Sequence, residues 1–134
     1  MSPERILLVV GIFIVSATFL ILFLRKLPKR VRKNRYVTKW RDIQQLCANK
    51  SNWPQAIMLA DLLLDDVLKR RKRDGKTMGE RLVSCQKDFT SNDSVWQAHK
   101  FANLVRENKA KLSEENVKKT LISFRKALQD MGAL

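Results

Sequence analysis

The chain has 134 residues, a formal net charge of +14, two cysteines and one histidine. Beside a membrane segment, this length provides for one small folded domain and not for two. The cysteine and histidine counts exclude a disulfide framework, and they exclude a zinc site of cysteine and histidine within one copy. Residues 1–35 carry eight basic residues and one acidic residue, so half of the net charge lies in about a quarter of the chain.

Residues 6–24 contain no charged side chain and are predicted to form a single transmembrane helix. All of them are hydrophobic except Gly11, Ser16 and Thr18. At a rise of about 1.5 Å per residue, such a helix roughly matches a hydrocarbon core of about 30 Å. A cleaved signal peptide is the alternative. It requires basic residues before a shorter apolar core and small residues at a cleavage site, whereas here the basic residues follow the core.

A basic linker, residues 25–35, follows the apolar segment directly. By the positive-inside rule, it places the C-terminal domain in the cytoplasm and the short N-terminus outside the cell (inner) membrane. Pro28 is expected to end or kink the helix. Basic side chains beside a span also reach anionic lipid headgroups, each contributing about 1 kcal/mol near the surface. The predicted lipid contacts are Arg25, Lys26, Lys29, Arg30, Arg32, Lys33 and Arg35.

Residues 36–134 are predicted to fold as a compact all-α bundle of about five helices. Apolar residues recur at helical spacing, and no segment alternates with a period of two. Asn52 and Ser113 are expected to cap helices, Gly75 is expected to take a left-handed position after the helix at 53–72, and Gly132 is expected to end the last helix. Thr77 and Glu80 fit a capping box. The predicted helices cover residues 36–49, 53–72, 78–87, 94–108 and 114–131.

The polar residues within these helices are given structural interpretations. Asp61, Asp65 and Asp66 are predicted to lie on a solvated face of the helix at 53–72, because their spacing does not direct all three toward one metal ion. His99 is expected to be a buried or half-buried structural residue. A catalytic base would need a partner in reach, and the sequence names none.

The remaining reactive groups also form no recognisable catalytic set. Cys47 and Cys85 are expected to act as small buried apolar residues. A glycine-rich phosphate loop, a metal cluster and a nucleophile–base pair are all missing from the sequence. We therefore expect no cofactor and no metal.

The region from Trp53 to Leu134 resembles a group of small helical proteins, many of them membrane-anchored, that are related to the HEPN superfamily. An ordered series of motifs carries this resemblance, rather than one short pattern. The motifs are Trp53, Ala56-Ile57, Ala60-Asp61, Leu63-Leu64-Asp65, Leu68-Lys69, Thr77–Leu82, Val95–Lys100 with Asn103, Leu112-Ser113, Phe124 and Leu128. The resemblance implies a HEPN-like helical bundle.

The sequence departs from this superfamily at the positions that carry its chemistry. HEPN ribonucleases use an arginine, often followed by a polar residue such as asparagine, and a histidine a few residues later. That pair would hold and polarise a phosphate for attack by a 2′-hydroxyl. In this chain the first position is Ala102, followed by Asn103, and the histidine position falls on Glu107, with Arg106 before it. The resemblance therefore implies the fold without the nuclease activity. Asn103 is then either a hydrogen-bonding relic of the family's site or a packing residue, and we favour packing.

Two functions from different classes follow. The first is a single-pass membrane-anchored cytoplasmic module, not an enzyme, that binds a protein partner or forms a homodimer. HEPN-like domains commonly pair through their helices, which makes the homodimer an expectation by analogy. The alternative is a membrane-tethered RNA-binding domain derived from a HEPN-type ribonuclease, since cations cluster at residues 69–73 and in residues 109–119. The candidate interaction or relic site comprises His99, Asn103, Arg106 and Glu107.

Overall fold

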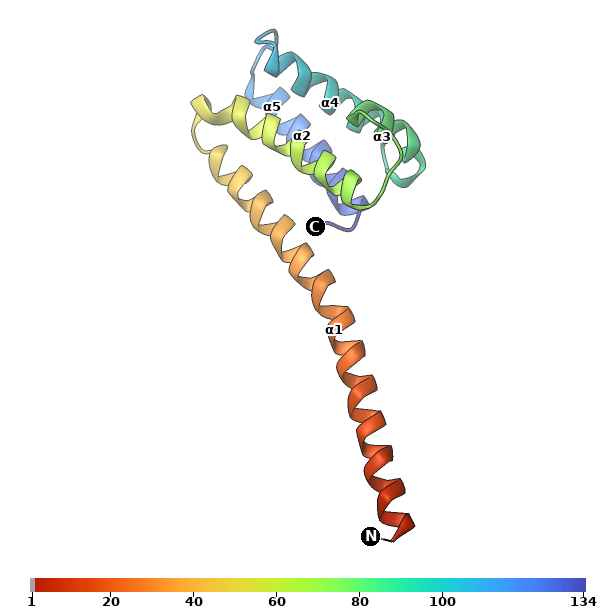
Figure 1. Cartoon of the computed structure of the whole chain (residues 1–134). Helices are drawn as coiled ribbons and strands as arrows, with labels where there is room; N and C mark the ends of the chain where they lie inside the picture. The colour runs from red at the N-terminus through yellow and green to blue at the C-terminus, as the bar shows by residue number, and fades with distance from the viewer. Residues whose placement is uncertain (1) are drawn as a thin grey trace. The chain divides into compact units, whose positions relative to one another are not determined.

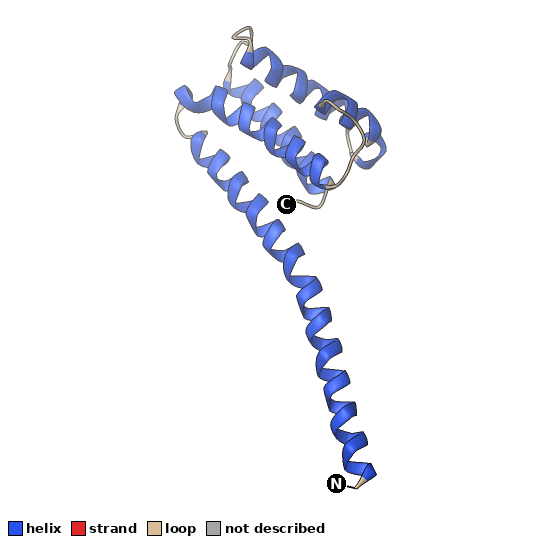
Figure 2. Cartoon of the chain, viewed as in Figure 1, coloured by secondary structure: helices blue, strands red, loops and turns tan. Residues whose placement is uncertain are grey.

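The computed structural model describes residues 2–134, without the side chains of residues 26–32. The chain divides into two compact units, Met1–Asn34 and Arg35–Leu134. Helix α1, Pro3–Leu46, begins in the first unit and ends in the second. The described residues form helices joined by loops and turns, with no strand among them, as Figures 1 and 2 show. The predicted all-α fold is confirmed.

The first unit consists of the apolar part of α1. The most apolar 18-residue window within residues 3–25 has a mean hydropathy of 3.0, and the side chains of residues 3–25 are exposed. This segment is long and apolar enough to cross a membrane. The helix continues through Pro28, so an end at that residue is wrong: a proline removes one backbone hydrogen bond without terminating this helix. Arg25, Lys33 and Arg35 are exposed, and the side chains of the other predicted lipid contacts, Lys26, Lys29, Arg30 and Arg32, lie outside the described residues.

The second unit is built around three helices that pack against one another: α2, Trp53–Arg70, α4, Asn92–Arg106, and α5, Glu114–Asp130. The last part of α1, residues 35–46, adds aromatic and aliphatic side chains to the core. A short helix η1, Lys50–Asn52, precedes α2, and α3, Met78–Ser84, with η2, Gln86–Asp88, precedes α4. The largest fully buried apolar side chains are Phe124, Ile57, Leu64, Leu68, Leu82, Leu128 and Val67.

Several predicted helix ends are confirmed. Thr77 and Glu80 form a capping box at the start of α3, in which the Glu80 backbone N–H donates to Thr77 Oγ1 over 3.2 Å. Ser113 Oγ accepts from the backbone N–H of Asn116 over 3.1 Å at the start of α5. Gly132, at φ +71°, provides the left-handed residue after α5.

Two predicted helix ends are wrong. Asn52 makes no side-chain cap to α2, because it belongs to η1, and it is Asn49 that caps η1 through Ser51 N–H. The left-handed residue after α2 is Lys72, at φ +54°, and not Gly75. The backbone N–H of Arg73 there donates to the carbonyl of Leu68 over 3.0 Å, which is the hydrogen bond of a Schellman motif.

Gly75 serves the turn that leads into α3. Its φ is +139°, and a Cβ at this position would lie 2.6 Å from the backbone nitrogen of Arg81. The side chain of Arg81 holds the same turn: its Nη1 donates to the carbonyl of Gly75 over 2.9 Å, and its Nε donates to Asp65 Oδ1 over 2.8 Å. The turn is therefore fixed to α2 through one buried arginine.

We expect Gly75→Ala to lower the free energy of unfolding by about 2 kcal/mol or more, because the new Cβ meets backbone at a strained φ. Gly79→Ala is the matched control. Its Cβ would lie 3.6 Å from Trp96, an ordinary contact, so this helical substitution should be neutral or stabilising by up to about 1 kcal/mol. Tryptophan fluorescence during urea unfolding checks both variants, since all three tryptophans lie in the second unit. Equal effects would contradict the role assigned to Gly75.

Candidate functional site

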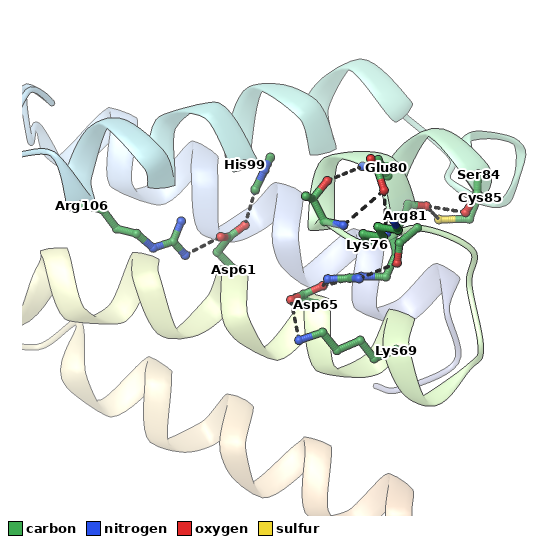
Figure 3. Close-up of polar contacts among 12 residues, drawn as sticks. Asp61, Asp65, Lys69, Lys76, Glu80, Arg81, Ser84, Cys85, His99 and Arg106 are labelled. Atoms are coloured by element: carbon green, nitrogen blue, oxygen red, sulfur yellow. Dashed lines mark hydrogen bonds and ion pairs between the residues drawn. The ribbon is translucent and has the colours of Figure 1, made fainter.

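The most buried charged side chain described in the second unit is Asp61, which is 2% exposed. It lies on α2 between the core residues Ile57 and Leu64. Two side chains of α4 reach it, as Figure 3 shows. His99 Nδ1 lies 2.8 Å from Asp61 Oδ1, and Arg106 Nη2 donates to Asp61 Oδ2 over 2.5 Å. Both carboxylate oxygens are therefore engaged by one neighbouring helix.

The predicted solvated face of α2 is wrong for Asp61. Asp61 follows Ile57 by four residues and precedes Leu64 by three, so helical geometry places it on the buried stripe. An aspartate is ordinarily expected to be exposed to solvent, but burial of a carboxylate is tolerated when it is paired and hydrogen-bonded. The interpretation is also wrong for Asp65, which is 14% exposed and paired with Arg81. It holds better for Asp66, which pairs at the surface with Arg70.

His99 is a half-buried residue whose orientation is set by Asp61. An ionised carboxylate only accepts hydrogen bonds, so Nδ1 carries the proton in the contact with Asp61. The ring meets Trp96 edge-on, with ring centroids 6.2 Å apart. Within the described residues, His99 Nε2 has no hydrogen-bond partner. An aspartate that orients a histidine in this way recurs in catalytic and metal sites, but it also occurs as a purely structural contact.

The four residues of the candidate interaction or relic site do not form one unit. Arg106 links to Asn103, whose Oδ1 accepts from Arg106 Nη1 over 2.7 Å. Asn103 is exposed, so the expectation that it serves packing is wrong. Glu107 is also exposed and pairs with Lys109 over 3.4 Å, away from the cluster. Asp61, which unites His99 with Arg106, was missing from the predicted site.

A groove in the second unit lies between residues 40–47, which form the end of α1 and the residue after it, and helix α5. We call it the α1/α5 groove, and its volume is about 490 Å³. Lys118 and Arg125 line its edge, together with Glu114 in the first turn of α5. Trp40 also lines the groove, and its Nε1 atom is buried in the protein without a hydrogen-bond partner among the described residues. The apolar lining consists of Trp40, Ile43, Trp53, Val117, Leu121 and Ile122.

Both cysteines are free thiols. Burial raises the pKa of the Cys47 thiol above its ordinary value. Burial raises the pKa of the Cys85 thiol as well. There the nearby charge of Arg73 lowers the pKa, and the charge of Asp88 raises it. Cys85 is 2% exposed, in agreement with the predicted buried role, and its Sγ donates to the carbonyl of Arg81 over 2.9 Å. Neither thiol lies in an environment that activates a nucleophile.

The described side chains contain no group of three or more His, Cys, Asp or Glu residues that could hold a metal ion. Comparison with known proteins finds no matching family, no similar curated protein and no similar solved structure.

We expect Asp61→Asn to destabilise the bundle by about 3 kcal/mol, because Arg106 then loses the carboxylate that compensates its partly buried charge. Asp66→Asn is the matched control on the same helix. Its ion pair with Arg70 is exposed, so the change should be within about 0.5 kcal/mol. Urea unfolding measures both variants, and a small effect at Asp61 would show that the cluster does not hold α2 and α4 together.

The thiols should react slowly with iodoacetamide at pH 8, with Cys85 slower than Cys47 because Cys85 is the more buried. Their raised pKa values lower the thiolate fraction, so each rate should climb as the pH rises through the folded-state pKa. The same shift stabilises the fold below the unfolded thiol pKa, and this contribution is lost above the folded one. Rates measured on Cys47→Ala and Cys85→Ala separate the sites. A Cys85 rate equal to that of the urea-unfolded chain would contradict its burial.

Proposed function

We propose that this protein is a single-pass membrane protein that presents a non-catalytic, HEPN-like helical module to a protein partner at the cytoplasmic face of a cell membrane. The observation that carries the proposal is the apolar helix of residues 3–25, whose side chains are all exposed in a chain with a separate folded core. Exposed apolar surface of this extent is not stable in water and calls for lipid.

The cytoplasmic placement is supported by the charges beside the apolar segment. Arg25, Lys33 and Arg35 are exposed at its C-terminal side, whereas Arg5 is the one basic side chain before it in the sequence. The asymmetry favours a cytoplasmic C-terminal unit. Interaction with anionic headgroups is the further role that we assign to these cations.

The non-catalytic assignment is supported by the way the polar residues engage one another. At the position where the HEPN ribonucleases carry an arginine, Ala102 is fully buried in the core. Arg106 and His99 are both directed to Asp61, so the cluster stabilises the contact between α2 and α4. Such a closed arrangement supports a structural role better than phosphate chemistry.

RNA binding is supported less well than protein binding. The run at residues 69–73 is partly neutralised, because Lys69, Arg70 and Arg73 form ion pairs with Asp65, Asp66 and Asp88. Phosphate binding depends on cations that are free to replace counterions. No aromatic side chain lies within that run to stack on bases.

We expect the full-length chain to remain in the membrane pellet after alkaline carbonate extraction and to be released by mild detergent. Ile14→Arg combined with Leu20→Arg should release it into the carbonate supernatant, because each arginine costs about 2.5–3.5 kcal/mol at the centre of a span. Ile14→Leu with Leu20→Ile is the matched control and should stay in the pellet. A C-terminal tag should resist protease added outside intact cells, and its digestion would contradict the proposed orientation.

The interaction role is tested on the same membranes. A lysine-reactive cross-linker should convert part of the full-length chain into a discrete heavier adduct. If only the uncross-linked chain is recovered at every cross-linker concentration, the proposed interaction function is wrong, even if the membrane anchor is correct.

A further inference from the structure

The α1/α5 groove is lined by one stripe from each of two helices. Trp40 and Ile43 of α1, with Cys47 directly after the helix, line one side of the groove, and Val117, Leu121 and Ile122 of α5 line the other. Ile122 is 57% exposed, and Leu121 is only partly covered. Two helices that present a shared apolar channel form the kind of groove in which a third amphipathic helix binds.

The lining of the groove includes two cations, Lys118 and Arg125, and one acidic residue, Glu114, so its charged side chains carry a net positive charge. Lys118 and Arg125 are both exposed, and neither forms an ion pair with any described residue. They lie seven residues apart on α5, so they project from the same face at a separation of roughly 10 Å along the helix. Acidic side chains with the same seven-residue spacing on a bound helix would match both of them.

A second copy of this chain fits the groove poorly. Residues 36–134 carry 19 basic and 12 acidic residues, so two such units repel each other. In a second copy, the helix α2 exposes Leu59 and Leu62 and could offer them to the groove. Its acidic residues are already paired within their own unit, so they are not free to pair with Lys118 and Arg125. The same net positive charge of residues 36–134 attracts an acidic partner protein.

We propose that the α1/α5 groove binds an amphipathic helix of an acidic partner protein, with its apolar side chains between α1 and α5 and two acidic side chains on Lys118 and Arg125. This inference rests on the proposed function, since it assigns a surface and a partner chemistry to the protein-binding module.

The test uses two synthetic helical peptides of about 18 residues with one leucine stripe. The acidic peptide carries Glu at two positions seven residues apart beside the stripe, and the basic peptide carries Lys there. Fluorescence anisotropy measures their binding to the full-length chain in nanodiscs, with empty nanodiscs subtracted. We expect the acidic peptide to bind more tightly, and the preference to weaken as salt increases. A benzophenone on the leucine stripe should form adducts with residues 40–47 or 117–125.

The decisive variant is Lys118→Glu with Arg125→Glu, which should weaken the acidic peptide by about tenfold or more and strengthen the basic one. Lys119→Glu with Lys126→Glu is the matched control. It makes the same charge change at the same spacing on α5 but outside the groove, and it should change binding by less than about twofold.

Several outcomes would overturn the inference. These are no binding tighter than about 1 mM, equal effects of the two double variants, or adducts elsewhere on the chain. Self-association that Lys118→Glu with Arg125→Glu abolishes would assign the groove to a second copy instead. Cross-linked adducts in membranes that persist in this variant would keep the proposed interaction function and move the partner to another surface. Absence of all adducts would reject both.

Discussion

The contact between Asp61 and Arg106 is the constraint on which the second unit depends. A carboxylate buried to this degree is stable only with a charged partner and filled hydrogen bonds, and α4 supplies both through Arg106 and His99. The pair fixes how α4 lies along α2, because His99 and Arg106 are seven residues apart and must reach one carboxylate. Helix α5 packs against both α2 and α4 and buries Phe124 and Leu128 in the core. The apolar core is therefore built on a relative position of α2 and α4 that polar side chains set.

The same contact limits the chemistry available to the cluster. Arg106 is held by Asp61 and Asn103, and Nδ1 of His99 is held by Asp61, so a bound anion would have to compete with a buried carboxylate. Ala102, four residues before Arg106, is fully buried in the core and has no polar side chain to offer. A cluster that closes on itself in this way supports the proposed scaffold role.

Much of the fold could be predicted from the sequence, because helical spacing and local capping need no distant partner. The capping box at Thr77 and the cap at Ser113 depend on residues three positions away. The site was harder to predict. Asp61 shares its stripe with Ile57 and Leu64, but an acidic residue on a buried stripe becomes plausible only when its partners are known, and those lie 38 and 45 residues away. Gly75 was misassigned because its backbone serves a turn that Arg81 fixes from α3.

Exposed cations lie both in the lining of the α1/α5 groove and directly after the apolar segment. Within the second unit, the cations at the end of α2 are partly neutralised by Asp65, Asp66 and Asp88. These ion pairs stabilise the end of α2 and leave less free positive charge for a ligand. Lys118 and Arg125 have no such partners among the described residues, and they line the groove beside apolar side chains. Arg25, Lys33 and Arg35 are exposed after the apolar segment. Cations beside an apolar surface suit an amphipathic acidic ligand, which is the chemistry that we propose for both places: lipid with anionic headgroups at the apolar segment, and a helix with acidic side chains at the groove. In this proposal the net charge of +14 serves acidic, amphipathic ligands and not nucleic acid.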